Sequence, residues 1–230
     1  MANQNNQQLN AWQEAQSRVI DLCKNASPED MTNRVPACPE WTAHDLLAHM
    51  VGVGADLISE AGPSGDINNW TQGHVDKRNQ LLPTEILNEW QELNPQVEQF
   101  MQNGPEQTRA FLLNDLIIHE QDLRGALKEP GEKENEAMTM AANTLLPNLG
   151  KQLDENNLPA INIEGPGIKQ TVGSNPAQAT LRTNACEVTR MITGRRSPTQ
   201  IQQMNWDGDP NQYMDNMVIV GNMRQQDLIE

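Results

Sequence analysis

Apolar residues recur at helical spacing through most of the first 155 residues of the chain. Residues 8–25 carry a rough apolar stripe, and helical patterns return over residues 42–59, 70–80, 83–101, 105–127 and 134–154. Pro105 stands at the start of one of these segments, where its missing N–H costs nothing. Four principal long helices joined by modest connections are typical of an antiparallel bundle.

An extended connector precedes the second helix. Pro36 and Pro39 fix φ and disfavour helix in the residue before each of them. Thr42 follows, with Asp45 three residues later, so the hydroxyl and the carboxylate can each accept a backbone N–H in a capping box. The helix is therefore predicted to begin at Thr42 and to run to about Ser59.

The pattern changes after Pro159 from helical periodicity to alternation. Residues 160–164 alternate between apolar and polar as in a strand, and residues 165–167 read Gly-Pro-Gly. Residues 168–172 are the predicted partner of this strand in a hairpin.

A further helix is predicted over residues 176–193, capped by Ser174 or Asn175. The tail beyond it mixes strand and helix character. The sequence therefore predicts a mainly α protein, with a helical bundle over residues 1–155 and a small α+β domain over residues 156–230.

The charge balance narrows the choice of partners. The chain has 16 Lys and Arg against 31 Asp and Glu, a formal net charge of −15. A field of that sign repels nucleic acid and anionic lipid. No apolar run approaches the 18 or so residues of a transmembrane helix. We therefore expect neither nucleic acid nor a membrane as a partner; nothing in the sequence indicates the oligomeric state.

The compartment is predicted from the cysteines and the N-terminus. Three cysteines without C-x-x-C spacing suggest neither a disulfide framework nor a cysteine zinc site. The first residues form neither a basic nor an apolar signal region. A cytoplasmic protein is the simplest interpretation.

The segment with the most chemistry lies in the helix over residues 105–127. Asp115, His119 and Asp122 share one face of this helix, and the apolar side chains around the same turns are Phe111, Leu113, Ile117 and Ile118. A helix that is apolar nearly all round is buried. Burying a carboxylate and an imidazole costs several kcal/mol unless they are paired or bind a cation.

His49 raises the same question on another helix. It lies between Leu46 and Val53 on the core side. Taken alone, Asp115 and His119 fit an ion pair and His49 fits a hydrogen-bonded core histidine. Together, two histidines and a carboxylate on neighbouring helices also fit a three-ligand metal site with an open position.

Three other residues give weaker signals. His44 lies in the first turn of its helix, where we expect it to be solvated. His74 lies in a polar stretch, as a surface residue or as a fourth ligand. Cys38 stands before a proline, and a reactive thiol there is the less favoured interpretation.

Two arginines follow Gly194 at the end of the last predicted helix. Arg195 and Arg196 fit either solvated compensation of the helix dipole or an anion-binding site. Among the candidate catalytic groups we also place Asp122, which could orient His49 by accepting its ring N–H, pair with an arginine, or serve as an ordinary buried acceptor.

The motifs resemble a known family. Residues 35–49, VPACPEWTAHDLLAH, resemble the signature P-x-C-P-x-W-T-x-x-D-L-x-x-H of the mycothiol-dependent maleylpyruvate isomerase family, within the DinB-like superfamily. Residues 115–127, DLIIHEQDLRGAL, are similar to the second metal-binding helix of that family. ITGRRS at 192–197 and the pattern W-x-G-D at 206–209 resemble its tail domain.

The resemblance implies a DinB-like four-helix bundle followed by a small α/β domain. It implies a divalent metal, typically zinc, held by His49, Asp115 and His119, with Asp115 where many relatives have Glu. It also implies a low-molecular-weight thiol cosubstrate, mycothiol or another small thiol, which the metal would bind as thiolate. The thiolate would then add to a small electrophilic substrate, isomerising it or transferring the thiol.

Other functions remain open on the sequence alone. A non-catalytic bundle that binds a metal, a small molecule or a partner is one, and a metal-dependent hydrolase with Glu120 or Asp122 as its general base is another. We expect the second domain to complete the active site, with Arg195 or Arg196 holding an anionic group.

Overall fold

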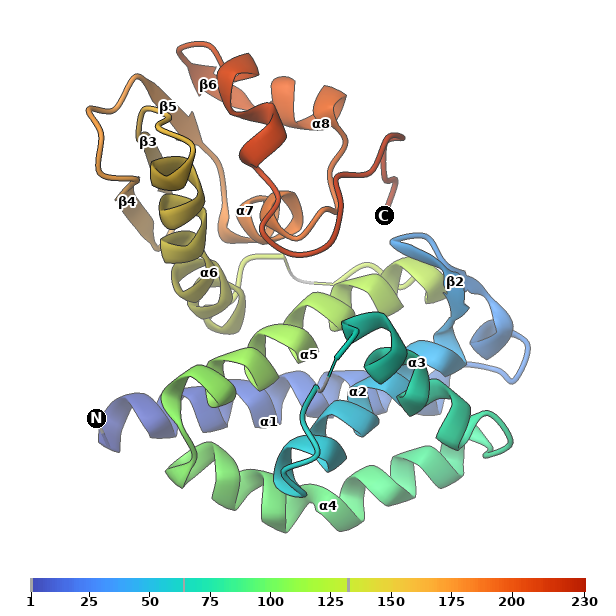
Figure 1. Cartoon of the computed structure of the whole chain (residues 1–230). Coiled ribbons are helices and arrows are strands. Elements are labelled where there is room, and N and C mark those ends of the chain that lie inside the picture. Colours follow the sequence, from blue (N-terminus) through green and yellow to red (C-terminus); the bar gives the residue numbers. More distant parts are fainter. Residues whose placement is uncertain (1, 64, 132) are drawn as a thin grey trace. The chain divides into compact units, whose positions relative to one another are not determined.

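The computed structural model describes residues 2–63, 65–131 and 133–230, which form two compact units (Figure 1). The first unit comprises Met1–Gly131 together with Glu230, and the second comprises Glu132–Ile229. We describe each unit by itself.

The first unit is a helical bundle. Its long helices are α1 (Ala2–Asn25), α2 (Ala43–Ile58), α4 (Pro83–Asn103) and α5 (Glu106–Leu127), and the shorter α3 (Ile67–Arg78) packs on α2. Helix α1 contacts α4 and α5, and α2 contacts α3, α4 and α5. The predicted four-helix bundle is confirmed.

The core of the bundle comes from the apolar stripes of its helices. The fully buried side chains include Trp12, Val19, Leu46, Leu47, Val53, Ile86, Trp90, Val97, Leu113, Ile117 and Leu123. At roughly 1.5–3 kcal/mol for each large aliphatic or aromatic side chain, this burial supplies the main stabilisation of the unit.

The connector before α2 is extended, as predicted. A single 3₁₀ turn, η1 (Asp30–Thr32), leads into a short antiparallel hairpin of β1 (Arg34–Val35) and β2 (Cys38–Thr42). The predicted capping box is present. The Thr42 hydroxyl accepts the Asp45 backbone N–H at 3.2 Å, and the Asp45 carboxylate accepts the Thr42 backbone N–H at 2.9 Å. The box fixes where α2 begins, and so which turn of α2 carries His49.

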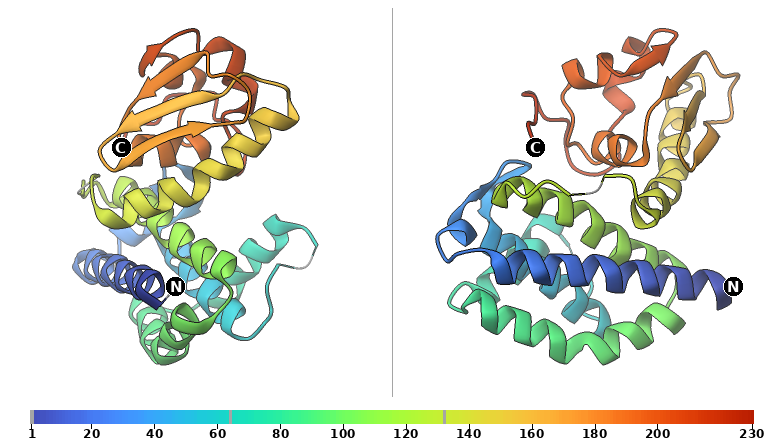
Figure 2. Two further views of the ribbon diagram at one scale, coloured as in Figure 1. Left: turned by 90° about the vertical axis from the view of Figure 1, so that its left-hand side faces the viewer. Right: turned by 180° about the vertical axis from the view of Figure 1, so that it is seen from behind.

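The second unit is a small α+β fold (Figure 2). Its elements are α6 (Glu136–Glu155), β3 (Ile161–Gly165), β4 (Ile168–Val172), β5 (Ala179–Arg182), α7 (Ala185–Ile192), α8 (Pro198–Gln202), β6 (Asn205–Asp207) and η2 (Asn211–Asn216). The sheet has the strand order β4-β3-β5-β6. Strands β3 and β5 run parallel, and the other two pairings are antiparallel. The predicted hairpin over residues 160–172 is confirmed.

Helix α6 belongs to the second unit, so the units divide near residue 131, whereas the sequence analysis divided them at 155. The apolar face of α6, with Met138, Ala142, Leu146 and Leu149 buried, packs against α7 and β4. A helical stripe shows that a helix needs a partner surface, but it does not show which one.

The single helix predicted over residues 176–193 is wrong in its first half. Residues 179–182 form β5, in which Ala179 and Leu181 are buried and pair with β3. Asn184, rather than Ser174 or Asn175, caps α7 by accepting the Glu187 backbone N–H at 2.9 Å. Two buried residues at a spacing of two are too short a pattern to mark a strand on their own.

None of the helices in the described residues is both long enough and apolar enough to cross a membrane.

Candidate metal centre

Two histidines and a carboxylate from two helices of the bundle converge on one point. His49 comes from the middle of α2, while Asp115 and His119 lie one turn apart on α5, which packs against α2. The Asp115 Oδ1 atom lies 3.5 Å from His49 Nε2 and 3.6 Å from His119 Nε2. The three ligand atoms all lie within 4.8 Å of one another.

These separations fit metal ligands better than hydrogen-bonded pairs. An N–H···O hydrogen bond usually spans about 2.7–3.2 Å. Ligands bound tetrahedrally to zinc at about 2.0–2.1 Å are about 3.3–3.4 Å apart. The observed 3.5 and 3.6 Å match the second value. The predicted ligand set is therefore assembled in a geometry that suits a divalent cation.

The site is recessed but not sealed. The side chain of His49 is 3% exposed, while those of Asp115 and His119 are 13% and 12% exposed. Burial alone would raise the pKa of Asp115, but the neighbouring imidazoles of His119 and His49 outweigh it and hold that pKa below its usual value. The carboxylate is therefore ionised at neutral pH, as a ligand must be.

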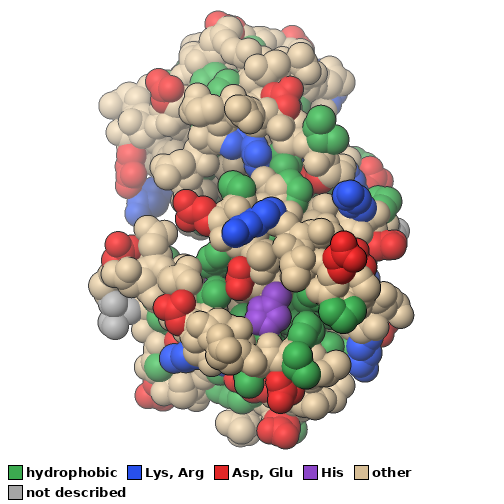
Figure 3. Space-filling model, turned by 90° about the vertical axis from the view of Figure 1, so that its right-hand side faces the viewer, with side chains coloured by type: hydrophobic (Ala, Val, Ile, Leu, Met, Phe, Trp, Pro, Cys, Tyr) green, Lys and Arg blue, Asp and Glu red, His purple; other side chains and the backbone are tan. Residues whose placement is uncertain are grey.

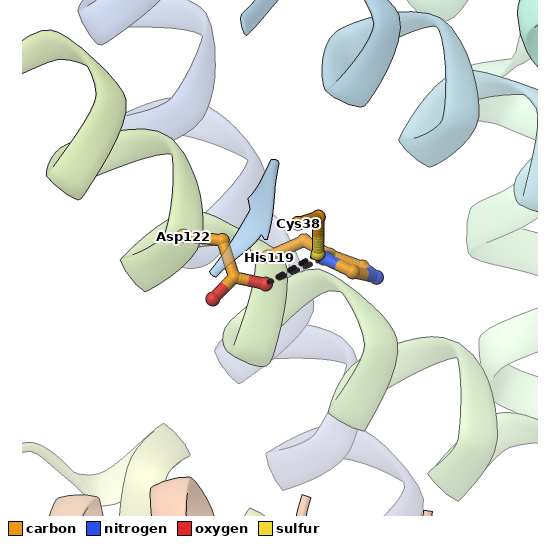
Figure 4. Close-up of side chains that lie close together, drawn as sticks. All are labelled: Cys38, His119 and Asp122. Carbon is orange, nitrogen blue, oxygen red and sulfur yellow. Dashed lines mark hydrogen bonds and ion pairs between the residues drawn. The ribbon is translucent and has the colours of Figure 1, made fainter. Parts of the chain in front are cut away.

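The outer nitrogen of His119 is held by Asp122. The Asp122 Oδ2 atom lies 2.9 Å from His119 Nδ1, and the Cys38 thiol donates to the same oxygen over 4.0 Å (Figure 4). A carboxylate can only accept, so His119 Nδ1 carries the proton and Nε2 keeps the lone pair that a metal needs. Asp122 thus orients His119, whereas the sequence analysis left open a contact with His49, a pair with an arginine or an ordinary buried acceptor.

Cys38, His119 and Asp122 also form a cluster of metal-ligating side chains. The 2.9 Å contact between His119 and Asp122 is an ordinary hydrogen-bond distance, which leaves a proton rather than a metal between them. We therefore interpret this cluster as the outer support of His119.

His74, expected at the surface or as a fourth ligand, is fully buried behind His49. Its Nδ1 lies 3.2 Å from Nδ1 of His49, and its Nε2 lies 3.1 Å from Oδ2 of Asp56. Burial lowers the pKa of His74. Sequence reasoning missed this pair because the residues around His74 are polar; the signal was a glycine, Gly52, on the facing turn of α2.

A cavity of about 360 Å³ opens beside the cluster. Its walls come from β2 and α3: Cys38, Pro39, Glu40, Trp41, Asn68, Thr71 and Gln72. The Trp41 ring lies 4.9 Å from the ring of His49, so this wall continues to the ligands. Histidine reaches the surface of the helical unit among acidic and hydrophobic side chains (Figure 3).

Three further polar residues of the bundle have structural partners. His44, expected to be solvated, is half-buried and bonds through Nε2 to the Leu81 carbonyl at 2.8 Å. Glu120 accepts hydrogen bonds from both Arg18 and Arg124. Arg109 donates to Gln8 at 3.0 Å. Glu120 is thus a buried counterion rather than an available base.

The two arginines predicted to bind an anion lie in the second unit. Gly194, at a φ of 76°, ends α7 before them. Arg196 is buried and makes a bidentate pair with Glu187, with both N–O distances at 2.7 Å. The half-buried Arg195 donates to the Thr193 carbonyl at 2.7 Å. Arg196 is therefore committed to its pair with Glu187.

The fold and the site together define a helical-bundle protein with a histidine–carboxylate centre and an α+β unit after the bundle. Residues 12–124 match the family model of the mycothiol maleylpyruvate isomerase N-terminal domain. The helical unit of this chain therefore matches that domain family, which confirms the resemblance in the motifs.

Solved structures support the fold across both units. Two crystal structures of the mycothiol-dependent maleylpyruvate isomerase, one of them a mutant, match with TM-scores of 0.55 and, for the mutant, 0.59. Each is 11% identical to this chain, and each match covers 85% of this chain and 93% of the other. No curated protein sequence matches the chain.

Proposed function

We propose that this protein is a metal-dependent enzyme that uses a low-molecular-weight thiol, of the mycothiol type, to isomerise or conjugate a small electrophilic substrate. The observation that carries the proposal is the convergence of His49, Asp115 and His119 with their donor atoms 3.5 and 3.6 Å apart. The domain family supports the choice of thiol.

The residues present fit a divalent cation, typically zinc. Two neutral imidazoles and one carboxylate are a common ligand set for catalytic zinc, which keeps a further position open for water or substrate. A cation held there supplies positive charge that keeps a thiol deprotonated at neutral pH.

The residues of the chain do the binding and orienting. Asp122 holds His119 with its Nε2 unprotonated. The partial exposure of Asp115 and His119 leaves an approach for the thiol and the substrate. The cavity lined by Trp41 and Cys38 offers an apolar wall for the carbon skeleton of the electrophile.

Several observations support this enzyme over the alternatives. A hydrolase needs a general base beside the reacting water. Glu120 is neutralised by two arginines, and Asp122 is engaged by His119 and Cys38. A purely structural metal needs a fourth protein ligand. Within the described residues, His74, the fourth ligand considered from the sequence, turns its two ring nitrogens to His49 and Asp56.

Arg195 of the second unit is our candidate for holding an anionic group of the thiol or substrate, since guanidinium pairs bidentately with carboxylates. Arg196 is a weaker one because Glu187 already holds it. We expect Arg195→Ala to raise KM for a carboxylate-bearing substrate more than it changes kcat. The exposed Arg182→Ala is the matched control.

The direct test combines metal analysis with a thiol screen. Protein purified without chelator should contain one divalent metal per chain. Mycothiol, bacillithiol and glutathione are then compared as cosubstrates with a panel of activated alkenes, including maleylpyruvate. Metal-free protein whose melting temperature is unchanged by added zinc would refute the proposal, as would stoichiometric metal without thiol chemistry for any of the three thiols.

A further inference from the structure

His49 faces a second buried histidine on the side away from Asp115. His74, on α3, places Nδ1 at 3.2 Å from Nδ1 of His49. On its other side, His74 Nε2 lies 3.1 Å from Oδ2 of Asp56. The Trp70 indole N–H donates to that same oxygen at 2.9 Å, and its ring packs edge-on against His74 with centroids 4.5 Å apart.

His49, His74 and Asp56 form a chain of contacts, and the proton positions in it follow from Asp56, the acceptor at its end. The Asp56 carboxylate accepts at 3.1 Å, so His74 Nε2 carries the proton of this contact. A neutral His74 then has a lone pair at Nδ1, and the 3.2 Å contact requires the proton of His49 to be on Nδ1. His49 Nε2 is left as a lone pair, at the atom that lies 3.5 Å from Asp115.

The backbone of α2 is shaped to admit His74. A Cβ placed on Gly52 would lie 2.5 Å from Cβ and 2.7 Å from Cδ2 of His74, distances that real Cβ atoms essentially never show. Glycine costs about 1 kcal/mol relative to alanine within a helix. The absence of a side chain at Gly52 allows the imidazole of His74, on α3, to reach His49. Two residues further on, a Cβ on Gly54 would meet only Val97, at an ordinary 3.8 Å.

We infer that His74 and Asp56 are positioning residues that fix His49 as the Nδ1–H tautomer and so hold its Nε2 ready to bind a metal. Gly52 makes the contact possible. The inference rests on the proposed metal centre for its purpose, but the tautomer can be measured in the absence of metal. Residues of this kind typically change metal affinity or activity 10–100-fold when they are removed.

The first test reads the tautomer directly. Long-range ¹H–¹⁵N correlation spectra of the full-length, metal-free chain, with His49 assigned by substitution, should show a proton on Nδ1 and none on Nε2. A proton on Nε2 of His49 in the native chain would overturn the inference.

The second test displaces His74 without altering either histidine. We expect Gly52→Ala to mix the two tautomers of His49 and to weaken zinc binding tenfold or more, while the matched Gly54→Ala changes neither. An unchanged tautomer and zinc affinity in a folded Gly52→Ala protein would contradict the inference.

A second variant serves if the Gly52→Ala protein does not fold. His74→Leu keeps an apolar side chain in the buried space but removes the acceptor, and should weaken zinc binding similarly. His74→Gln, whose amide oxygen can accept from His49, should restore part of the affinity; equal affinity in the two variants would count against positioning. If the native chain binds no zinc, the proposed function fails, while the spectra still decide the tautomer.

Discussion

Nδ1 of His119 lies 2.9 Å from Oδ2 of Asp122, three residues further along α5. The spacing is set by the helix, because residues three apart share a face and their side chains meet. Asp122 is 1% exposed, so this bond is made where water does not compete with it. A proposed ligand and the group that orients it thus come from one helix.

Substitution of Asp122 tests this relationship. Asp122→Asn keeps the shape of the side chain but removes the charge that favours the Nδ1–H tautomer of His119. We expect a folded protein whose zinc affinity or thiol turnover falls about 10–100-fold. The measurement is a zinc competition titration alongside a thermal melt.

Glu106→Gln is the matched control, since Glu106 is an exposed carboxylate on the same helix. It should leave both measurements unchanged. If Asp122→Asn behaves like this control, Asp122 acts only as scaffold.

The ligands themselves give the largest expected effects. Alanine at His49, Asp115 or His119 should abolish stoichiometric zinc binding, because two remaining ligands do not hold the cation in a recessed site. At a ligand concentration 100 times Kd, binding stabilises a fold by about 2.7 kcal/mol. Zinc should therefore raise the melting temperature of the native chain and not of these variants.

His44→Ala controls for loss of a histidine from α2. His44 bonds to the Leu81 carbonyl, away from the ligand atoms. Zinc should stabilise this variant as it does the native chain. Loss of the zinc effect in His44→Ala, or its persistence in all three ligand variants, would place the metal elsewhere.

The helical part of the site could be predicted from the sequence because helix geometry is local. Asp115 and His119 are four residues apart on a helix that is apolar on its other sides, which fixes their common face. The position of His49 followed from the same reasoning applied to a second helix, in which it lies on the core side. The residues alone left a metal site open beside an ion pair and a hydrogen-bonded histidine, and the resemblance favoured the metal site.

What could not be predicted depends on contacts between elements. His74 reaches His49 only because α3 packs on α2 at Gly52, and periodicity within α3 does not show that approach. Strand β5 was missed because its parallel partner β3 is not its neighbour along the chain. Such pairings are decided by tertiary packing.

The Arg196–Glu187 pair predicts a pH dependence of stability. Burial would raise the pKa of Glu187, but the hydrogen bonds and charge of Arg196 outweigh it and lower that pKa below 4.5. A carboxyl with a depressed folded-state pKa stabilises fully above its unfolded value, and this contribution is lost as the pH falls through the folded value. Glu187→Gln should therefore cost about 1–3 kcal/mol at neutral pH.

The difference between Glu187→Gln and the native chain should shrink as the pH falls below 4.5, which urea unfolding at several pH values would show. Glu155→Gln is the control, because Glu155 is 63% exposed in its pair with Lys151. Exposed pairs contribute about 0–1 kcal/mol. If the stability difference between Glu187→Gln and the native chain did not depend on pH, the Glu187 carboxylate would not be the source of that stability.

The division of the chain near residue 131 predicts how truncated proteins behave. A chain of residues 1–131 contains α1 to α5 and all three proposed ligands, so we expect it to fold cooperatively and to bind zinc.

A chain of residues 1–155 adds α6 without the α7 and β4 surfaces that cover its apolar face. The exposed Leu146 and Leu149 should make that longer chain bind a hydrophobic dye, aggregate and lose residues 136–155 to protease. A 1–155 chain that is more stable than the 1–131 chain, with α6 protected from protease, would show that α6 belongs to the bundle after all.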